Sequence, residues 1–478
     1  MYYFHCRLHF VIFIFLMMSS CHNAPEPNAA HPDTTAKSGA GRTAGQQAVR
    51  LITLDPGHFH AALVQKSMYP GVDSNVYVYA PAGQDVRDHL ARISAYNTRE
   101  KDPTRWNERV YTGPDYLQRM IDDKKGNTVV LAGNNREKTN YILRSLESGF
   151  NVLADKPMVI DAHAFGLLRQ AFDTAASRRL VLYDIMTERY EITSMLQREL
   201  AALPAVYGKQ IKGDASHPGI RASSVHRWYK YVSGKALIRP AWSFDVSQQG
   251  EGIVDVMTHL VDLVQWVGFP GQTLDYASDV RVDHARHWTT DLTLAQFRTV
   301  TGLDRFPDYL RKYAGSTNDS VLKIYANGEI DYRLRGVAVR TTVTWTYDAP
   351  PGAGDTYSSV MRGTRARLVI SQDSADHYQP TLYIEPLQMD SAYERDLVTR
   401  FASLETKYPG IGLEKKGGRW AVFIPDHYKE GHEAHFARVT EKYLGFLKYH
   451  DMPSWEIPNM IAKYYTTTRA LEMARNEH

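Results

Sequence analysis

The sequence contains very little cysteine, and this excludes one class of fold. Only two of its 478 residues are cysteines, Cys6 and Cys21, so a small domain held together by several disulfides is excluded. An excess of one charge is also missing, since 56 Lys and Arg stand against 53 Asp and Glu and no basic block occurs. Proteins that bind nucleic acid carry such a basic patch, so we expect no nucleic-acid partner.

Long apolar runs are missing as well. The run near the N-terminus, Phe10 to Met18, is shorter than the roughly 20 residues of a membrane-spanning helix. It follows Arg7, as in a secretory signal, and residues 16–21, LMMSSC, resemble a bacterial lipobox. We predict a lipoprotein signal peptide over residues 1–20 and lipid attachment at Cys21, with an ordinary signal peptide as the alternative. The protein would then be exported and anchored to a bacterial membrane by this lipid alone, in the periplasm or at the cell surface.

Residues 21–48 are rich in Pro, Ala, Gly and Thr and have no apolar period. This composition predicts a flexible tether. The rest of the chain is long enough for two or three domains.

Short apolar runs alternate with helical stretches in residues 49–200. Strands are predicted at 49–54, 75–79, 128–132, 150–154 and 180–183, and helices at 114–123 and 136–148. Gly149 follows the second helix at a position suited to a left-handed C-cap. The alternation predicts a parallel, doubly wound sheet of the Rossmann type.

The pattern of predicted secondary structure changes from about residue 206 onward. Longer strand-like segments occur at 321–325, 329–334, 337–347 and 366–370, and Asn327-Gly328 predicts a hairpin turn between the first two. A final helix is expected near 457–475. We therefore predict an α/β protein in which the Rossmann domain is followed by an α+β domain with a large, mainly antiparallel sheet.

The first predicted strand ends in a turn that contains one glycine. In a dinucleotide-binding domain this turn reads G-x-G-x-x-G, because glycines let the pyrophosphate approach the free N–H groups of the next helix. Here Asp55, Gly57 and His60 stand at the three glycine positions. The turn alone therefore leaves open an α/β domain that binds no nucleotide.

Asp155-Lys156-Pro157 comes directly after the predicted strand 150–154, at the end of a strand where open α/β sheets bind ligands. The tripeptide resembles the Glu-Lys-Pro signature of the Gfo/Idh/MocA oxidoreductases, with Asp in place of Glu. A surface Lys before a turn-forming Pro is the alternative.

A second stretch with catalytic residue types runs from Gly250 to Trp266. On a helix its Asp255, His259 and Asp262 fall on one stripe, and nearly all its other residues are apolar, so we expect the helix to be buried. The stretch resembles the family's Gly-Gly-x-x-x-Asp-x-x-x-His-x-x-Asp pattern at a matching distance from the Lys-Pro motif. A structural Asp and His with satisfied hydrogen bonds is the alternative.

The resemblance implies the roles of these residues. Lys156 would lie beside the reacting hydroxyl and stabilise an alkoxide. His259 and Asp255 would form the acid/base pair or its orienting partner, with His as a base of near-neutral pKa. The implied cofactor is NAD or NADP. The residues expected to border it are Gly57, His58, Phe59, His60, Asn135, Asp155 and Lys156. Lys138 replaces a family histidine, and strand 75–79 does not end in an acidic residue that would bind a ribose hydroxyl.

Aromatic and basic residues precede the second stretch. Rings stack on sugar faces and cations bind hydroxyls, so we expect substrate contacts from Arg227, Trp228, Arg239 and Trp242, with half-buried interface aromatics as the alternative. No metal site is predicted. Residues 432–435, HEAH, lack the spacing of the zinc motif His-Glu-x-x-His, and we expect them on a solvated helix face.

These observations predict an NAD(P)-dependent oxidoreductase that oxidises a hydroxyl of a sugar or glycoside to a keto-sugar. Residues 49–200 would bind the dinucleotide, and residues 201–478 would bind substrate and mediate oligomerisation. The cofactor would be tightly held, because an exported protein cannot draw on the cytoplasmic nicotinamide pool. The alternatives are a redox-neutral, NAD-dependent glycoside-cleaving enzyme of the same family and a non-catalytic sugar-binding lipoprotein. A small carbohydrate is the expected partner, and the family's subunit pairing suggests a homo-oligomer.

Overall fold

The computed structural model describes residues 48–476, apart from 233–234, 316–317 and 351–352. The predicted signal peptide, Cys21 and nearly all of the predicted tether lie outside the described residues. Within the described part of the chain, no helix is both long and apolar enough to cross a membrane.

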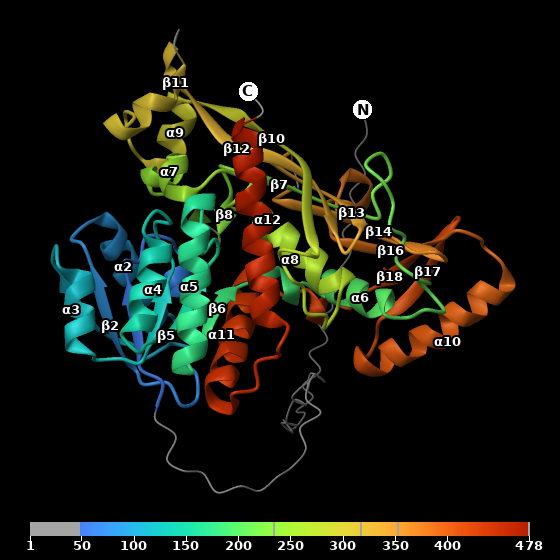
Figure 1. Ribbon diagram of the computed structural model, residues 1–478, viewed down its shortest axis with the longest axis horizontal. Helices are drawn as coiled ribbons and strands as arrows, with labels where there is room; N and C mark the ends of the chain where they lie inside the picture. The colour runs from blue at the N-terminus through green and yellow to red at the C-terminus, as the bar shows by residue number, and fades with distance from the viewer. Residues whose placement is uncertain (1–47, 233–234, 316–317, 351–352, 477–478) are drawn as a thin grey trace, which may run out of the picture. The chain divides into compact units, whose positions relative to one another are not determined.

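A six-stranded parallel sheet forms the first half of the described chain. Its strands are β1 (Leu51–Leu54), β2 (Asn75–Ala80), β3 (Asn107–Thr112), β4 (Thr128–Leu131), β5 (Asn151–Asp155) and β6 (Leu182–Ile185). They lie in the order β3-β2-β1-β4-β5-β6, which confirms the predicted doubly wound sheet (Figure 1). The order changes direction between β1 and β4, and ligands of such sheets bind there, outside the carboxyl ends of the strands.

Helices connect these strands. They are α1 (His60–Leu63), α2 (Gln84–Thr98), α3 (Tyr116–Asp123), α4 (Lys138–Glu147) and α5 (Ala162–Arg178). Strands such as β1 and β4 are continuous runs of buried residues, because a parallel sheet is covered on both faces. Gly149 follows α4 with a φ of 87°, which confirms the predicted left-handed C-cap.

The second half contains a ten-stranded, mainly antiparallel sheet, as predicted. Its main path is β10 (Val280–Thr293), β12 (Asn318–Leu334), β13 (Val337–Thr346), β7 (Ile220–Arg227), β14 (Thr356–Arg362), β15 (Ala366–Ser371), β16 (Thr381–Pro386), β18 (Arg419–Phe423) and β17 (Gly412–Lys416), and β11 (Ala314–Gly315) pairs with β12. Only β13 and β7 run parallel among its described pairs. The helices of this half include α6 (Ile192–Ala201), α7 (Val246–Gln249), α8 (Met257–Gly268), α9 (Leu294–Thr301) and α10 (Ser391–Lys407).

The predicted hairpin turn at Asn327-Gly328 is wrong. Both residues lie inside β12, where the buried Asn327 side chain hydrogen-bonds the backbones of the neighbouring strands β10 and β13. A Cβ on Gly328 would lie 2.3 Å from Ile253 Cγ1, so this glycine is needed for close packing and not for a turn. The hairpin forms instead at Arg335-Gly336, where both residues have positive φ, as in a type I′ turn.

The last two helices, α11 (His432–Tyr449) and α12 (Glu456–Asn476), return to the first sheet. Phe436, Tyr443 and Tyr464 are buried in the same apolar core as β1, β4 and β5. Helix α12 also packs against α5 and α8, and Figure 1 shows it in red beside α5. The C-terminal helices therefore tie the second half of the chain to the first sheet.

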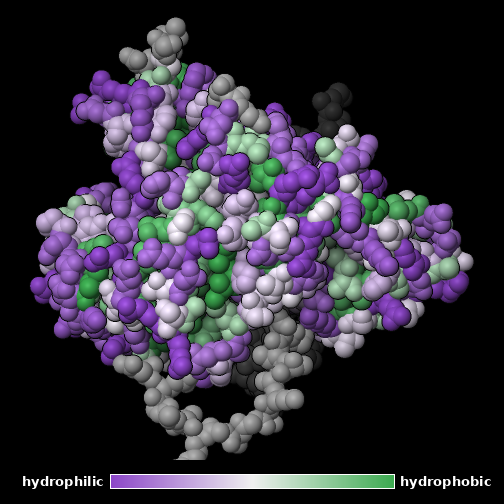
Figure 2. Space-filling model, viewed as in Figure 1, coloured by the Kyte–Doolittle hydropathy of each residue, from purple (hydrophilic) through white to green (hydrophobic). Residues whose placement is uncertain are grey.

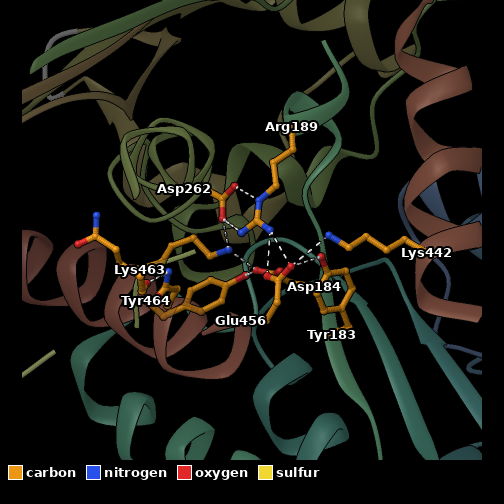
Figure 3. A network of polar contacts seen from close by, with 10 residues as sticks. Tyr183, Asp184, Arg189, Asp262, Lys442, Glu456, Lys463 and Tyr464 are labelled. Atoms are coloured by element: carbon orange, nitrogen blue, oxygen red, sulfur yellow. Dashed lines mark hydrogen bonds and ion pairs between the residues drawn. The ribbon is translucent and has the colours of Figure 1, made fainter. Parts of the chain in front are cut away.

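A buried network of charges joins these elements (Figure 3). Its charged members are Asp184, Asp262, Glu456, Arg189, Lys442 and Lys463. Lys463 Nζ lies 2.6 Å from Asp184 Oδ2 and 2.8 Å from Asp262 Oδ1, and Arg189 donates two hydrogen bonds of 2.7 Å to Asp262. Asp262 therefore holds α8 against η1 (Thr187–Tyr190) and α12. Its role in this structure is to position the helix that carries His259.

The face of the molecule in Figure 2 is largely hydrophilic. Apolar residues are exposed there in small, separate groups, as is ordinary for a protein surface. This face gives no support to a large apolar subunit interface, and the predicted homo-oligomer stays a prediction.

Candidate active site

A cavity of about 1570 Å³ is lined by residues of both sheets. One wall consists of residues at the carboxyl ends of β1, β4, β5 and β6, and the other of residues from β7, β12, β13 and the start of α8. The first wall is the position at which an open α/β sheet binds its ligands. The volume exceeds that of an ordinary small-molecule pocket, about 300–1,000 Å³, so the cavity has room for two ligands side by side.

Lys156 and Asp255 meet on the cavity wall, although 99 residues separate them in the sequence. Lys156 Nζ donates a 2.6 Å hydrogen bond to Asp255 Oδ1, and Gln249 Nε2 donates one of 3.0 Å to Asp255 Oδ2. Burial raises the pKa of Asp255, but the charge and hydrogen bond of Lys156 and the hydrogen bond of Gln249 together hold that pKa below its ordinary value. The carboxylate is therefore ionised and orients the ammonium group toward the cavity.

His259 lies on the same wall, in the first turn of α8. Its Nδ1 is buried and has no hydrogen-bond partner. Burial, and then the charge of Lys156, lower the pKa of His259 to about 3, so the ring is neutral at neutral pH and not the near-neutral base that we expected. A neutral imidazole can accept a hydrogen bond from a substrate hydroxyl, and both burial and the charge of Lys156 oppose its protonation.

The turn at Gly57 differs from a standard phosphate-binding turn. The N–H groups of Gly57 and His58 both donate to the backbone oxygen of Ala132, at 3.2 and 3.1 Å, and α1 is only four residues long. A Cβ on Gly57 would lie 3.0 Å from Asp85 Oδ2 and 3.1 Å from Trp242 Cζ2. The space through which a pyrophosphate normally approaches this glycine is thus taken by a carboxylate and an indole ring.

Asp85 is a residue that sequence reasoning missed. It stands in the first turn of α2, beyond the end of β2 where we looked for an acidic residue, and accepts a 2.8 Å hydrogen bond from Trp242 Nε1. Burial raises the pKa of Asp85 to about 6. If Trp242 moves aside, this carboxylate is placed to accept hydrogen bonds from ribose hydroxyls beside Gly57.

The loop after β4 contains Asn135, which we expected to border the cofactor. Asn135 donates its side-chain N–H to the backbone oxygen of Gln249 at 2.7 Å, and its backbone N–H to that of Gln248 at 2.9 Å. Its Oδ1 is buried without a partner, and the residue lines the cavity, as Asp155 and Lys156 do. The residues present thus fit the nicotinamide end of a dinucleotide, whereas the phosphate end fits only when Trp242 leaves Gly57.

His58 and His60 turn toward the end of β5. His60 Nδ1 lies 2.9 Å and His58 Nδ1 3.5 Å from Asp155 Oδ2. The His60 ring, which stands at the third glycine position of the turn, also packs against Phe436 of α11 at 4.5 Å between centroids. Phe59 is half-buried and packs on the core of the first sheet. The predicted cofactor residues of this turn are therefore brought together, but their side chains contact one another and α11.

Residues 432–435 were predicted to lie on a solvated helix face, and this prediction is wrong for His435. His435 is buried, and both His432 and His435 line the cavity. The His432 ring lies 5.1 Å from that of His60 between centroids. The i, i+3 spacing of the two histidines gave no sign of this, because α11 returns to the first sheet from almost 400 residues further along the chain.

Arg227, Trp228 and Arg239 lie near one another, and the polar groups of the two arginines are used internally, whereas Trp228 Nε1 is buried without a partner. Arg227 donates to Gly354 O, and Arg239 donates to the backbone oxygens of Trp228 and Arg227 at 3.0 Å each. Trp228 stacks on Trp345 with 4.2 Å between ring centroids. Arg227, Trp228 and Arg239 line the cavity, whereas Trp242 does not appear in its wall. Their contact with a substrate stays a prediction.

Another group of polar residues, Lys230, Asp355 and Glu188, also lines the cavity. Lys230 Nζ lies 2.6 Å from Asp355 Oδ2, and Glu188 stands in η1, three residues after β6. Burial, together with the charges of Glu191 and Asp355, raises the pKa of Glu188 to about 7. Glu188 could have been identified from the sequence, because it follows a predicted strand and ligands of a parallel sheet bind at the carboxyl ends of its strands.

Comparison with known proteins places this geometry in context. The family described as "Putative oxidoreductase C terminal domain" matches residues 196–475. A putative oxidoreductase from Parabacteroides merdae is 53% identical in sequence, with a TM-score of 0.89 over 92% of this chain and 100% of that chain. No curated protein matches the sequence.

More distant solved structures share the fold. A levoglucosan dehydrogenase in complex with NADH and levoglucosan is 12% identical, with a TM-score of 0.56 over 90% of this chain and 98% of that chain. GenD2 from gentamicin A biosynthesis, in complex with NAD, is 14% identical, with a TM-score of 0.54 over 92% of this chain and 98% of that chain. At these identities the likeness shows only that the two-part fold is shared.

Proposed function

Because the chain belongs to the oxidoreductase family defined by this C-terminal domain, we propose that it is an NAD(P)-dependent enzyme that oxidises a secondary hydroxyl of a sugar or glycoside. The observation that carries the proposal is the meeting of Lys156 and Asp255 beside the unpartnered His259 in one cavity. A polar cluster of this kind at the carboxyl end of a parallel sheet is the usual place of catalysis.

Each of the three residues has a distinct task in this proposal. The Lys156 ammonium group donates a hydrogen bond to the substrate oxygen and stabilises the negative charge that develops there. Asp255, itself held by Gln249, keeps the ammonium in position. His259 accepts the hydroxyl proton as hydride leaves the same carbon for the nicotinamide, and the alkoxide character that develops beside Lys156 offsets the charge which, after burial, lowers the pKa of His259.

A nicotinamide ring would supply the hydride acceptor. Asn135, whose Oδ1 is free for a ligand, and the end of β5 at Asp155 would hold it, and Asp85 would face the ribose. The bound NADH of levoglucosan dehydrogenase and the bound NAD of GenD2 support this choice.

The proposed substrate class is a carbohydrate. The cavity lining combines the stacked Trp228 and Trp345 rings with the charged Lys230 and Asp355, and sugars are bound by aromatic faces together with charged hydrogen-bonding groups. The levoglucosan in the complex of a fold relative supports the same class.

Export and lipid attachment at Cys21 remain part of the proposal. The motif at residues 16–21 supports it. Mass spectrometry of membrane-bound protein from a bacterial host tests it: a diacylated Cys21 at the mature N-terminus is expected, and a Cys21→Ala variant that stays membrane-bound would argue against the anchor.

One observation favours a second candidate, the redox-neutral cleavage of a glycoside. Elimination of a glycosidic oxygen next to a ketone needs a further acid/base group, and Glu188 lines the cavity with a pKa of about 7. A group that titrates near neutral pH suits proton transfer.

The test begins with the purified protein, denatured to release whatever small molecule it holds. NAD or NADP in near-stoichiometric amount is expected, or else binding of added NAD or NADP by calorimetry. A panel of sugars and glycosides then follows, with reduction of the nicotinamide as the readout, and Lys156→Met is compared with Lys323→Met, an exposed lysine. No dinucleotide released or bound would favour the sugar-binding lipoprotein, for which the occupied Gly57 turn already argues.

A further inference from the structure

Two histidines and a carboxylate meet where the Gly57 turn approaches the end of β5. One imidazole nitrogen each of His58 and His60 and one oxygen of Asp155 all lie within 4.8 Å of one another. His58 and His60 are two residues apart on the turn, and Asp155 comes from a strand almost 100 residues later. Among the residues that the structure describes, this is the one group of histidine, cysteine and acidic side chains with such spacing.

The separations suit donors around a single ion. Zinc bonds to histidine nitrogen and carboxylate oxygen are about 2.0–2.2 Å long, so tetrahedral donors stand roughly 3.4 Å apart. The His60 and His58 nitrogens lie 2.9 and 3.5 Å from Asp155 Oδ2. The His58 and His60 nitrogens lie within 4.8 Å of each other, so the third separation is also of the order needed for a shared ion.

A second observation also points to a ligand. His58 Nδ1 is buried and has no hydrogen-bond partner, although a buried imidazole nitrogen is nearly always paired. His58, His60 and Asp155 all line the cavity. This nitrogen, whose only described polar contact is the 3.5 Å ion pair with Asp155, thus stands beside the carboxylate at a place that a ligand can reach.

The surrounding charges restrict the kind of ion. Asp155 is the single carboxylate of the group, and two lysines are close: Lys138 donates to the backbone oxygen of Asp155 at 3.0 Å, and Lys156 is the next residue. Calcium and magnesium prefer several oxygen ligands, so this site does not suit them. Imidazole nitrogens suit zinc, iron, nickel and copper.

We propose that His58, His60 and Asp155 bind one divalent transition-metal ion of the zinc or iron(II) class. Two histidines and one carboxylate leave coordination positions open. These positions face the cavity beside Lys156, where a hydroxyl or carbonyl oxygen of a substrate could become a ligand. The site does not include Lys156, Asp255 or His259, but it shares Asp155 with the proposed nicotinamide site, so metal and dinucleotide binding are measured separately.

Metal binding is tested on the intact purified protein with Zn²⁺ as the probe. Elemental analysis after dialysis and competition against a chromogenic chelator are expected to give one Zn²⁺ per chain, and Co²⁺ is expected to produce visible absorption at the same site. Mg²⁺ serves as the negative control. Dinucleotide binding is measured on the same samples, so that loss of the metal site and failure of the proposed function can be told apart.

The variants are chosen to keep the shape of the turn. Asp155→Asn and a His58→Gln/His60→Gln double variant are expected to weaken Zn²⁺ binding by more than about tenfold, since even loss of an outer-shell partner costs that much. His89→Gln is the matched control, because His89 is also buried and lines the cavity but lies outside the group. Circular dichroism without metal verifies that each variant is folded.

Two results would overturn the proposal. One is a wild-type protein that binds less than stoichiometric Zn²⁺ in the competition assay, which would leave the group as a hydrogen-bonded triad. The other is unchanged stoichiometry and affinity in a folded Asp155→Asn or double variant, which would identify the bound ion as adventitious.

Discussion

Lys463 is the residue whose removal tests the buried charge network most directly. The side chain is fully buried, and its ammonium lies 2.6 Å from Asp184 and 2.8 Å from Asp262, whose side chains are 1% and 2% exposed. Lys463→Met keeps most of the volume and removes the charge. Asp262 then retains Arg189, but Asp184 retains only a 2.9 Å hydrogen bond from Tyr464.

The expected loss of stability follows from these contacts. Coulomb's law with an effective dielectric constant of about 20 gives roughly 6 kcal/mol of attraction for each contact of Lys463. Desolvation of the buried charges offsets most of it, but breaking a buried pair from one side costs about 3–5 kcal/mol, because a buried charge is left uncompensated. We expect the free energy of unfolding of Lys463→Met to fall by this amount.

The pH dependence of the loss has a defined sign. Burial raises the pKa of Asp184, whereas the charge and hydrogen bond of Lys463 lower it. The Lys463→Met variant lacks this lowering effect. The folded variant therefore takes up a proton at Asp184 more readily than the unfolded chain, and its stability increases as the pH falls through that range. The difference in the free energy of unfolding between the wild type and Lys463→Met is thus expected to be larger at pH 8 than at pH 5.

Urea unfolding followed by circular dichroism at both pH values measures these differences. Lys442→Met is the matched control: Lys442 is 32% exposed and its partner Glu456 keeps Arg189, so we expect a loss below about 1 kcal/mol. Asp184→Asn/Lys463→Met removes both charges and is expected to regain more than half of the loss. A Lys463→Met loss below about 1 kcal/mol, or a double variant no more stable than the single one, would refute the reasoning.

Three further predictions concern two residues of the candidate site and one glycine of the large sheet. Lys156→Met is expected to lower kcat/KM for the oxidised carbohydrate by about 100-fold or more in steady-state assays, because the developing alkoxide loses its donor; equal activity would remove Lys156 from the reaction. Glu188→Gln is expected to abolish any change in rate near pH 7, which a pH–rate profile detects, and an unchanged profile would assign that titration to another group. Gly328→Ala is expected to lower the free energy of unfolding by about 1–3 kcal/mol through its clash with Ile253, whereas Gly431→Ala, with open space around its Cβ position, is expected to change little in the same urea titration.

The regular parts of the fold were predictable from sequence because their signals are local. Each parallel strand is a short buried run between helices, and Gly149 marks the end of α4 by its positive φ. The Asn327-Gly328 prediction failed because a local turn signal was overridden by packing: the glycine makes room for Ile253, and the neighbouring strands use the asparagine. Turn propensity describes four residues, whereas this position is decided by a segment about 75 residues away.

Only those residues of the candidate site that belong to a sequence motif could be predicted. Lys156, Asp255 and His259 were found by resemblance, and the structure brings them to one cavity. Asp85 and His432 were missed, because each approaches the site only through tertiary packing. The low pKa of His259 could not be foreseen either, since it results from burial and from the charge of Lys156.

Two of the departures of the chain from the Gfo/Idh/MocA pattern that its sequence resembles are in contact with each other. His60 stands where the family has the third glycine of its turn, and Asp155 stands where it has the glutamate of Glu-Lys-Pro; their side chains are 2.9 Å apart and hydrogen-bonded. In a decaying site such changes would be independent, and a histidine in the tight turn would displace the helix from the sheet. Here the ring is accommodated by Asp155 and Phe436, so the two substitutions form one matched pair. This favours a site whose chemistry has been altered over a site that has been lost, and it is the reason to measure metal and dinucleotide on the same purified protein.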